Sequence, residues 1–128
     1  DDYRTELHLH PKLSPITVAV LPLMKKDGLA EKAKEIQHAL KEEFVTDYDQ
    51  SGTVGKRYRR QDEVGTPFCV TVDYDTITEK TEDGSNNPHF NTVTVRFRDS
   101  MAQERVKLDD LVGFIQNAIR TYKPVEKK

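Results

Sequence analysis

The feature that most constrains the fold is a continuous apolar run at residues 16–21, ITVAVL, which Pro22 follows. A run of this kind, rich in β-branched residues and lacking polar alternation, is typical of a strand that is covered on both faces of a sheet. We therefore expect a central, parallel strand at this position. Such a strand requires a crossover connection, which is usually a helix.

A helix is predicted directly after this strand, at residues 28–43, with Asp27 as its N-cap. Its apolar residues recur at the spacing of a single helix face: Leu29, Ala33, Ile36 and Leu40. Such a stripe is typical of a helix that packs on a sheet. The chain therefore begins as a β-loop-α unit.

The remaining elements continue this mixed pattern. Further strands are expected at residues 44–49, 68–74, 93–97 and 103–108. A short helix is expected at 53–64 with Gly65 as its left-handed cap, and a closing helix, capped near Asp109, carries Leu111, Ile115, Ala118 and Tyr122. The strands at 68–74 and 93–97 should pair as a hairpin, and the turn formers of 76–91 predict a mobile connection between them.

These elements predict one α/β domain: a mixed, roughly five-stranded sheet flanked by three helices. A chain of 128 residues suits a single core. The expected core residues are Val18, Val20, Ile36, Leu40, Val70, Val72, Val95, Leu111 and Ile115. We expect residues 1–14 to be a linker from an absent upstream domain, 15–122 to be the domain itself and 123–128 to be a tail.

Composition excludes several classes of function. No apolar run approaches the roughly 20 residues that span a bilayer, and the N-terminus lacks a signal-peptide profile. The single cysteine, Cys69, faces away from the apolar row of its strand and is expected to be a buried thiol. These features favour a cytoplasmic protein without disulfides. His8 and His10 have no third ligand at a familiar spacing, so we expect no metal site.

No catalytic constellation is present, and SGTVGKRY lacks the spacing of a phosphate-binding loop. The remaining feature that could indicate a function is a local concentration of positive charge. The stretch KRYRR at residues 56–60 is densely cationic in a chain whose net charge is −2. With cations from two other segments it could form one basic surface: Lys25, Lys26, Lys56, Arg57, Arg59, Arg60, Arg96 and Arg98. The alternative is that Arg96 and Arg98 pair with Asp73 and Asp75 across the hairpin, which leaves an ordinary solvated helix.

Three segments together resemble the C-terminal anticodon-binding domain of glycyl-tRNA synthetase, the α2-type class II enzyme. They are LSPITVAVLPLMKKDGLAEKAKEI, YDQSGTVGKRYRRQDEVGTPFCVTVDYDT and NTVTVRFRDSMAQERV. RRQDEVGTPFCVT and Arg-Asp-Ser-Met at 98–101 are specific to the glycyl type. The sequence departs from this family at Phe97, where an acidic residue is usual, and in the length of 76–91.

The resemblance implies a fragment of glycine–tRNA ligase whose partner is the anticodon stem-loop of glycine tRNA. The full-length enzyme would use ATP and Mg²⁺ at upstream sites, would form a homodimer and would act in the cytoplasm; the fragment itself would hold no cofactor. The cations would contact phosphates. One of Asp62, Glu63 and Asp73 would accept a hydrogen bond from the N4 amino group of an anticodon cytosine.

Two alternatives share the fold. One is the anticodon domain of a sister class II synthetase, such as the prolyl, threonyl or histidyl enzyme. The other is a protein-interaction module, as in the accessory subunit of the mitochondrial DNA polymerase. The fold by itself does not choose among them.

Overall fold

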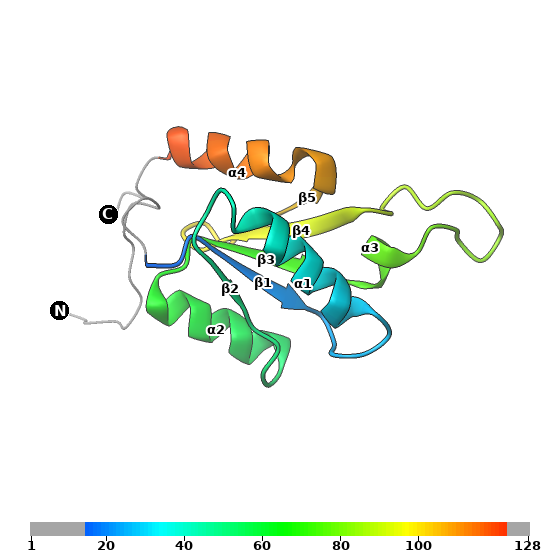
Figure 1. Ribbon diagram of the computed structural model, residues 1–128, viewed down its shortest axis with the longest axis horizontal. Coiled ribbons are helices and arrows are strands. Elements are labelled where there is room, and N and C mark those ends of the chain that lie inside the picture. Colours follow the sequence, from blue (N-terminus) through cyan, green and yellow to red (C-terminus); the bar gives the residue numbers. More distant parts are fainter. Residues whose placement is uncertain (1–14, 123–128) are drawn as a thin grey trace.

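The computed structural model describes residues 15–122, which form a five-stranded mixed sheet in the order β2-β1-β3-β4-β5 (Figure 1). The predicted linker at 1–14 and the predicted tail at 123–128 lie outside the described residues. The strands are β1 (Val18–Pro22), β2 (Thr46–Tyr48), β3 (Phe68–Val72), β4 (Thr92–Phe97) and β5 (Gln103–Lys107). The helices are α1 (Leu29–Leu40), α2 (Val54–Val64), the single turn α3 (Tyr74–Ile77), the 3-10 turn η2 (Leu108–Asp110) and α4 (Leu111–Arg120). The predicted fold class is confirmed.

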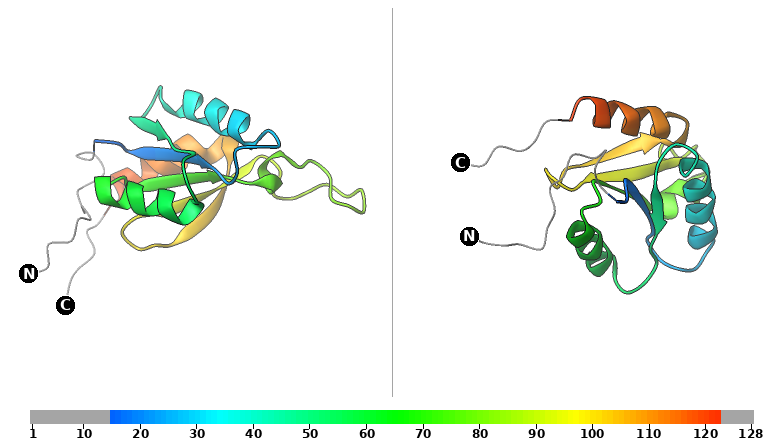
Figure 2. Two further views of the ribbon diagram at one scale, coloured as in Figure 1. Left: turned by 90° about the horizontal axis from the view of Figure 1, so that it is seen from below. Right: turned by 60° about the vertical axis from the view of Figure 1, so that its left-hand side comes forward.

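Strand direction places helices on both faces of the sheet. β1 runs parallel to both of its neighbours, with Val20 opposite Tyr48 on β2 and Val70 on β3. The chain leaves β1 in one direction to form β2 and then returns past β1 to form β3. Because both crossovers are expected to be right-handed, α1 and α2 must lie on opposite faces. Figure 2 shows this arrangement, with α4 on the same face as α1.

The main core lies between the sheet and the α1/α4 layer, and all nine predicted core residues are buried in it. The α2 face holds a smaller cluster in which Tyr58 of α2 packs on Ala19, Leu21 and Cys69. Burial raises the pKa of the Cys69 thiol to about 12, so the thiolate that would be reactive is disfavoured. The prediction of a buried thiol is confirmed.

The structure confirms the predicted end of α2 but not the predicted N-cap of α1. Gly65 ends α2 with a φ of 82°, as predicted. The helix begins at Val54 rather than at Thr53, and Thr53 caps it by accepting a hydrogen bond from Lys56 N. The predicted N-cap of α1 is wrong: Gly28 occupies that position with a φ of 85°. Asp27 accepts a hydrogen bond from the Tyr74 hydroxyl instead.

The predicted helix and strand at residues 28–49 are also shifted at their shared boundary. The α1 helix ends at Leu40 rather than at residue 43, because residues 41–43 form a turn. Correspondingly, β2 begins at Thr46 rather than at residue 44.

The connection between β3 and β4 contains more structure than its sequence indicated, and it extends beyond the right-hand end of the sheet in Figure 1. The α3 turn begins with a reciprocal cap between Asp73 and Thr76. Further along, Lys80 and Asn86 form an isolated bridge, and the buried Asn87 side chain donates to the Thr78 carbonyl. Its polar residues thus organise the segment through local hydrogen bonds. Its mobility stays a prediction.

Candidate nucleic-acid interface

The carboxyl ends of the three parallel strands meet at one edge of the sheet, which we call the carboxyl edge. The loop after β1 carries Lys25 and Lys26, the loop after β2 leads into α2 with Lys56 in its first turn, and Asp73 follows β3. All three lysines are exposed. Open α/β sheets commonly bind ligands at such an edge, at the point where the chain reverses its winding. The structure therefore brings four of the predicted site residues to the same edge.

Arg57 is not part of the exposed charge of α2. Only 3% of it is exposed, and its Nε and Nη2 donate to the Gly52 carbonyl at 3.3 and 3.0 Å. Its Nη1 donates to the carbonyl of Pro22, the last residue of β1. The expectation that Arg57 belongs to a basic surface is therefore wrong, because it is buried and its guanidinium ties α2 to the end of β1.

The other cations of α2 differ in their partners. Arg59 is exposed. Arg60 Nη1 donates to both carboxylate oxygens of Asp49 at 2.6 Å. Buried Gln61 completes this network by donating to Asp47 and Asp49. Among the cations of residues 56–60, Lys56, Arg59 and Arg60 are exposed, and Arg60 differs from the other two in its ion pair with Asp49.

Asp62 of α2 and Arg96 of β4 form a buried ion pair. The guanidinium contacts both carboxylate oxygens at 3.2 and 3.3 Å and lies 4.6 Å from the ring centroid of Tyr58. Burial lowers the pKa of Arg96, but the hydrogen bonds and charge of Asp62 outweigh burial and raise it. A buried charge of this kind is stable because its partner and an aromatic face replace water.

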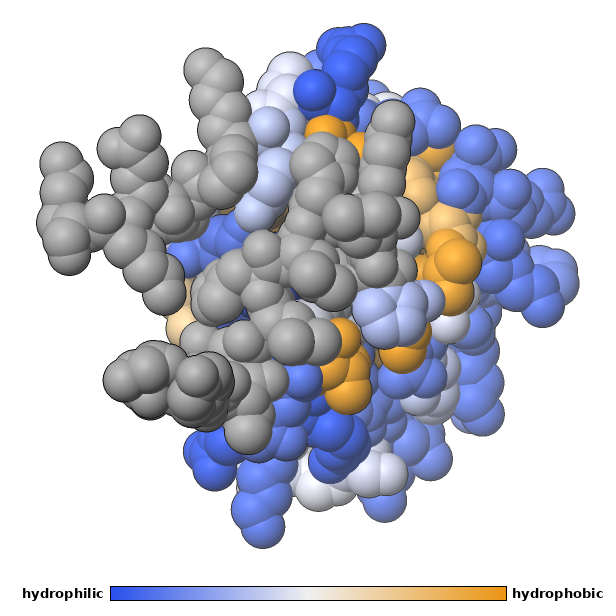
Figure 3. Space-filling view, turned by 90° about the vertical axis from the view of Figure 1, so that its left-hand side faces the viewer, coloured by the Kyte–Doolittle hydropathy of each residue, from blue (hydrophilic) through white to orange (hydrophobic). Residues whose placement is uncertain are grey.

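Arg98 is also buried, at 3% exposure. It donates to the Gly65 carbonyl at 2.6 Å and to Asp99 at 2.7 Å. These contacts lie at the opposite end of the sheet from Asp73. Figure 3 shows the molecule from that end, and the coloured part of the surface has small hydrophobic areas among hydrophilic ones. The structure therefore does not gather the predicted cations into one basic surface.

The alternative pairing of Arg96 and Arg98 with Asp73 and Asp75 is also wrong. The antiparallel register of β3 and β4 places Arg96 opposite Cys69, near the start of β3, whereas Asp73 follows the end of β3. Glu63, the remaining predicted carboxylate, is exposed near the end of α2.

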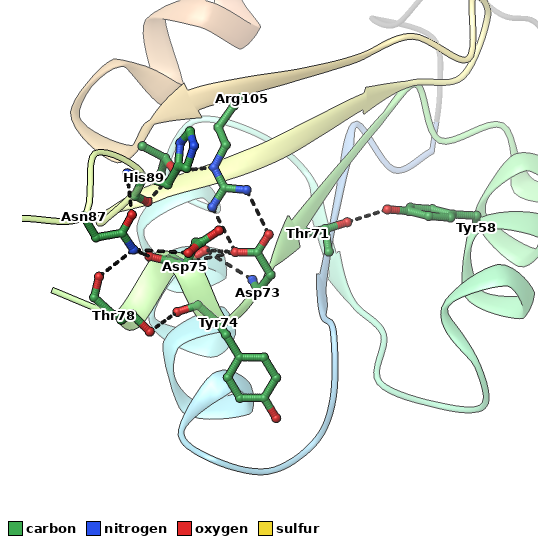
Figure 4. Close-up of polar contacts among 11 residues, drawn as sticks. Tyr58, Thr71, Asp73, Tyr74, Asp75, Thr78, Asn87, His89 and Arg105 are labelled. Carbon is green, nitrogen blue, oxygen red and sulfur yellow. Dashed lines mark hydrogen bonds and ion pairs between the residues drawn. The ribbon is translucent and has the colours of Figure 1, made fainter. Parts of the chain in front are cut away.

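Asp73 pairs instead with Arg105, which the sequence reasoning missed (Figure 4). Arg105 Nη1 and Nη2 each donate to one carboxylate oxygen of Asp73 at 2.9 Å, and Arg105 Nε donates to the Thr92 hydroxyl at 2.5 Å. Burial by itself raises the pKa of the Asp73 carboxyl, but the contacts with Arg105 and Thr76 hold that pKa below its usual value. The available signal was the position of Arg105 on β5, directly before the buried Val106 and hence on the other face.

Tyr74 adds an aromatic ring to the carboxyl edge. It lies next to Asp73, 38% of it is exposed, and its hydroxyl donates to Asp27 at 2.7 Å. Figure 4 shows its ring pointing away from the Asp73–Arg105 pair. The edge thus combines exposed cations, the Asp73 carboxylate fixed by Arg105, and the exposed Tyr74 ring. Groups of these kinds recognise phosphates and unstacked bases.

The described residues show no other kind of site as clearly. Between residues 15 and 122, no three His, Cys, Asp or Glu side chains lie close enough together to hold a metal ion. No helix in the same range is long and apolar enough to cross a membrane.

Comparison with protein families gives a match to the anticodon-binding domain over residues 17–118. The chain is 64% identical to a glycine–tRNA ligase of Treponema denticola over 96% of this chain and 25% of that relative. It is 52% identical to the glycine–tRNA ligase of Clostridium perfringens over 92% of this chain and 22% of the relative. The chain therefore spans about a quarter of the length of these curated relatives.

Two solved structures share the fold at lower identity. The RNA-binding domain of threonyl-tRNA synthetase from Cryptosporidium parvum Iowa II has a TM-score of 0.67 and 23% identity, over 88% of this chain and 25% of that one. Prolyl-tRNA synthetase from Cryptosporidium parvum has a TM-score of 0.75 and 20% identity, over 91% of this chain and 23% of that one.

The contrast between Arg57 and Arg59 predicts unequal effects on stability. Arg57→Ala should lower the free energy of unfolding by about 1–3 kcal/mol, because it removes buried donors from two backbone carbonyls. Arg59→Ala, two positions along on the exposed face, should change it by less than about 0.5 kcal/mol. Urea denaturation of both variants measures the difference. A loss for Arg57→Ala as small as that expected for Arg59→Ala would contradict the structural role of Arg57.

The lowered pKa of Asp73 predicts a pH-dependent contribution to stability. A carboxyl group whose pKa is lower in the folded than in the unfolded state stabilises the fold when ionised. This contribution should be complete above the ordinary value of 3.8 and should disappear as the pH falls through the folded-state pKa. Asp73→Asn keeps a capping side chain for α3 but loses the charge. The stability difference between parent and variant should therefore shrink below pH 4, and a difference that stays constant down to pH 2 would contradict this assignment.

Proposed function

The chain belongs to the anticodon-binding domain family, and we propose that it binds the anticodon stem-loop of glycine tRNA as one part of a glycine–tRNA ligase. The observation that carries the choice of glycine is the identity of 64% to a glycine–tRNA ligase over nearly the whole chain. The threonyl and prolyl structures support only the fold, since their identities are 23% and 20%.

The carboxyl edge is the surface that we assign to the RNA. Lys25, Lys26 and Lys56 at this edge, and Arg59 about one turn further along α2, are exposed and suit phosphate contacts. The exposed ring of Tyr74 suits stacking with an unpaired base, and Asp73 suits hydrogen bonding to one. Arg60 would contribute less, because Asp49 already offsets its charge.

The buried members of the predicted site receive a different role. Arg57, Asp62, Arg96 and Arg98 are each less than 10% exposed and hydrogen-bonded inside the protein. Contact with RNA would require breaking those bonds and leaving a buried partner unpaired, which is costly. We assign them to holding α2 and the sheet in place. Glu63 stays a candidate because it is exposed.

In the full-length enzyme, parts outside this chain would bind ATP, Mg²⁺ and glycine and attach glycine to the tRNA. We propose a homodimeric enzyme that acts in the cytoplasm, with residues 1–14 as the linker from the catalytic part and 123–128 as a tail. A protein-interaction module of the same fold is the second candidate. It would not require the exposed cations of the carboxyl edge to bind RNA.

A gel-shift series with the 128-residue chain tests the proposal. Anticodon stem-loops of glycine, proline and threonine tRNAs should bind in the order glycine first, with weaker binding of the other two. Equal binding of all three would contradict glycine specificity. Preference for the proline or threonine loop would favour a sister synthetase, and absence of binding would favour an interaction module.

The phosphate role of Arg59 predicts a sequence-independent effect. Arg59→Gln should weaken binding to all three stem-loops by a similar factor and should reduce the slope of log K against log salt by something near 0.7, as expected for one contact to a single strand. Arg120→Gln, on the opposite α4 layer, is the matched control and should leave the slope unchanged. A salt slope equal to that of the parent would make Arg59 an ordinary surface residue.

A further inference from the structure

The Asp73–Arg105 pair presents an unused acceptor beside an unused donor. Asp73 Oδ1 is fully engaged, since it accepts from Thr76 N, the Thr76 hydroxyl and Arg105 Nη2. Asp73 Oδ2 accepts only from Arg105 Nη1 among the described residues. A carboxylate oxygen has two lone pairs and Nη1 carries two hydrogens. One lone pair of Oδ2 and one N–H of the neighbouring Nη1 therefore remain.

These two groups are held in place by the protein. Thr92 fixes Arg105 at Nε, and Thr76 fixes Asp73 at Oδ1, so each planar group has an anchor in addition to the ion pair. Positioning of this kind before binding reduces the entropy lost when a ligand binds. The pair therefore resembles a preorganised recognition site more than it resembles two mobile surface charges.

The pair is also accessible. Arg105 lies across from Thr94, and Thr94 lies across from Thr71, whose hydroxyl contacts Tyr58 of α2; the pair thus lies on the α2 face. The two long helices α1 and α4 cover the other face. Within residues 15–122, α2 is the helix on this face, and it packs on β1 and β3 (Figure 2). A quarter of each side chain of the pair remains exposed.

An acceptor next to a donor matches the pairing edge of cytosine. That edge offers the N4 amino group as a donor next to N3 as an acceptor. Uracil has a carbonyl oxygen in place of the amino group, which a carboxylate oxygen would repel. We propose that Asp73 Oδ2 and Arg105 Nη1 together read an anticodon cytosine, with Arg105 as a specificity-determining residue; this inference rests on the proposed function.

The other two predicted carboxylates fit this task less well. Asp62 has both oxygens engaged with Arg96 in a buried position. Glu63 is exposed, and no described contact fixes its orientation. Asp73 is the one of the three that is both held and accessible.

The test compares single C-to-U substitutions in the glycine anticodon stem-loop, measured by fluorescence anisotropy with the 128-residue chain. The parent should prefer cytosine over uracil at one position by about 5-fold to 150-fold, the range for a good bidentate contact. Arg105→Lys keeps the charge but loses the planar fork. It should reduce this preference at least fivefold or abolish it, mainly through weaker binding of the cytosine loop.

Two further variants separate base reading from structure and charge. Asp73→Asn keeps the cap of α3 but exchanges an acceptor for an amide that can donate, so the preference should fall or shift toward uracil. Arg120→Lys, the matched substitution on α4, should leave the preference unchanged. Thermal unfolding of each variant shows that the protein measured is folded.

The outcomes divide clearly. Loss of preference in folded Arg105→Lys and Asp73→Asn, with the parent preference kept in Arg120→Lys, supports the inference. Retention of the parent ratio in both, or a parent that binds cytosine and uracil loops equally, overturns it. Failure of the proposed function would look different, because the parent would then show no preference for the glycine loop over the proline and threonine loops.

Discussion

The structure depends on burying β1 on both faces. One face of the strand packs into the α1/α4 core through Val18 and Val20, and the other packs against Tyr58 of α2 through Ala19 and Leu21. Two helices on opposite sides of one strand require the chain to reverse its winding there. Because β1, β2 and β3 run parallel, the loops that follow them lie at one edge of the sheet, beside the strand where the winding reverses. The position of the candidate site thus follows from the apolar run at 16–21.

Burial separates arginines with a structural role from those available to a ligand. Arg57, Arg96 and Arg98 are ion-paired or hydrogen-bonded within the protein. Displacing them would leave their buried partners unpaired, which is costly. Arg105 is different because its pair is only partly buried and keeps groups for a further hydrogen bond. A basic stretch in the sequence is therefore a poor guide to which cations are available to a ligand, and the contacts of each cation are a better guide.

Much of the fold could be predicted because it is encoded in local periodicity. The apolar stripe of α1, the alternation in β3 and β4, and the Gly65 cap of α2 all involve residues close in sequence. The site was harder to predict because its contacts join residues that are far apart in the sequence. Arg105 lies on β5 and Asp73 directly follows β3, 32 residues away, with β4 between the two strands, and no local pattern connects them. Likewise, the burial of Arg57 depends on the carbonyl of Pro22, 35 residues away.

The central claim is that the carboxyl edge, and not the opposite end of the sheet, is the RNA surface. Titrating the ¹⁵N-labelled chain with the glycine anticodon stem-loop and following amide chemical shifts by NMR tests it most directly. The account predicts that the largest changes cluster at residues 23–28, 53–59 and 73–75 and at Arg105. Changes concentrated instead at 65–68 and 98–101, or on α1 and α4, would contradict it.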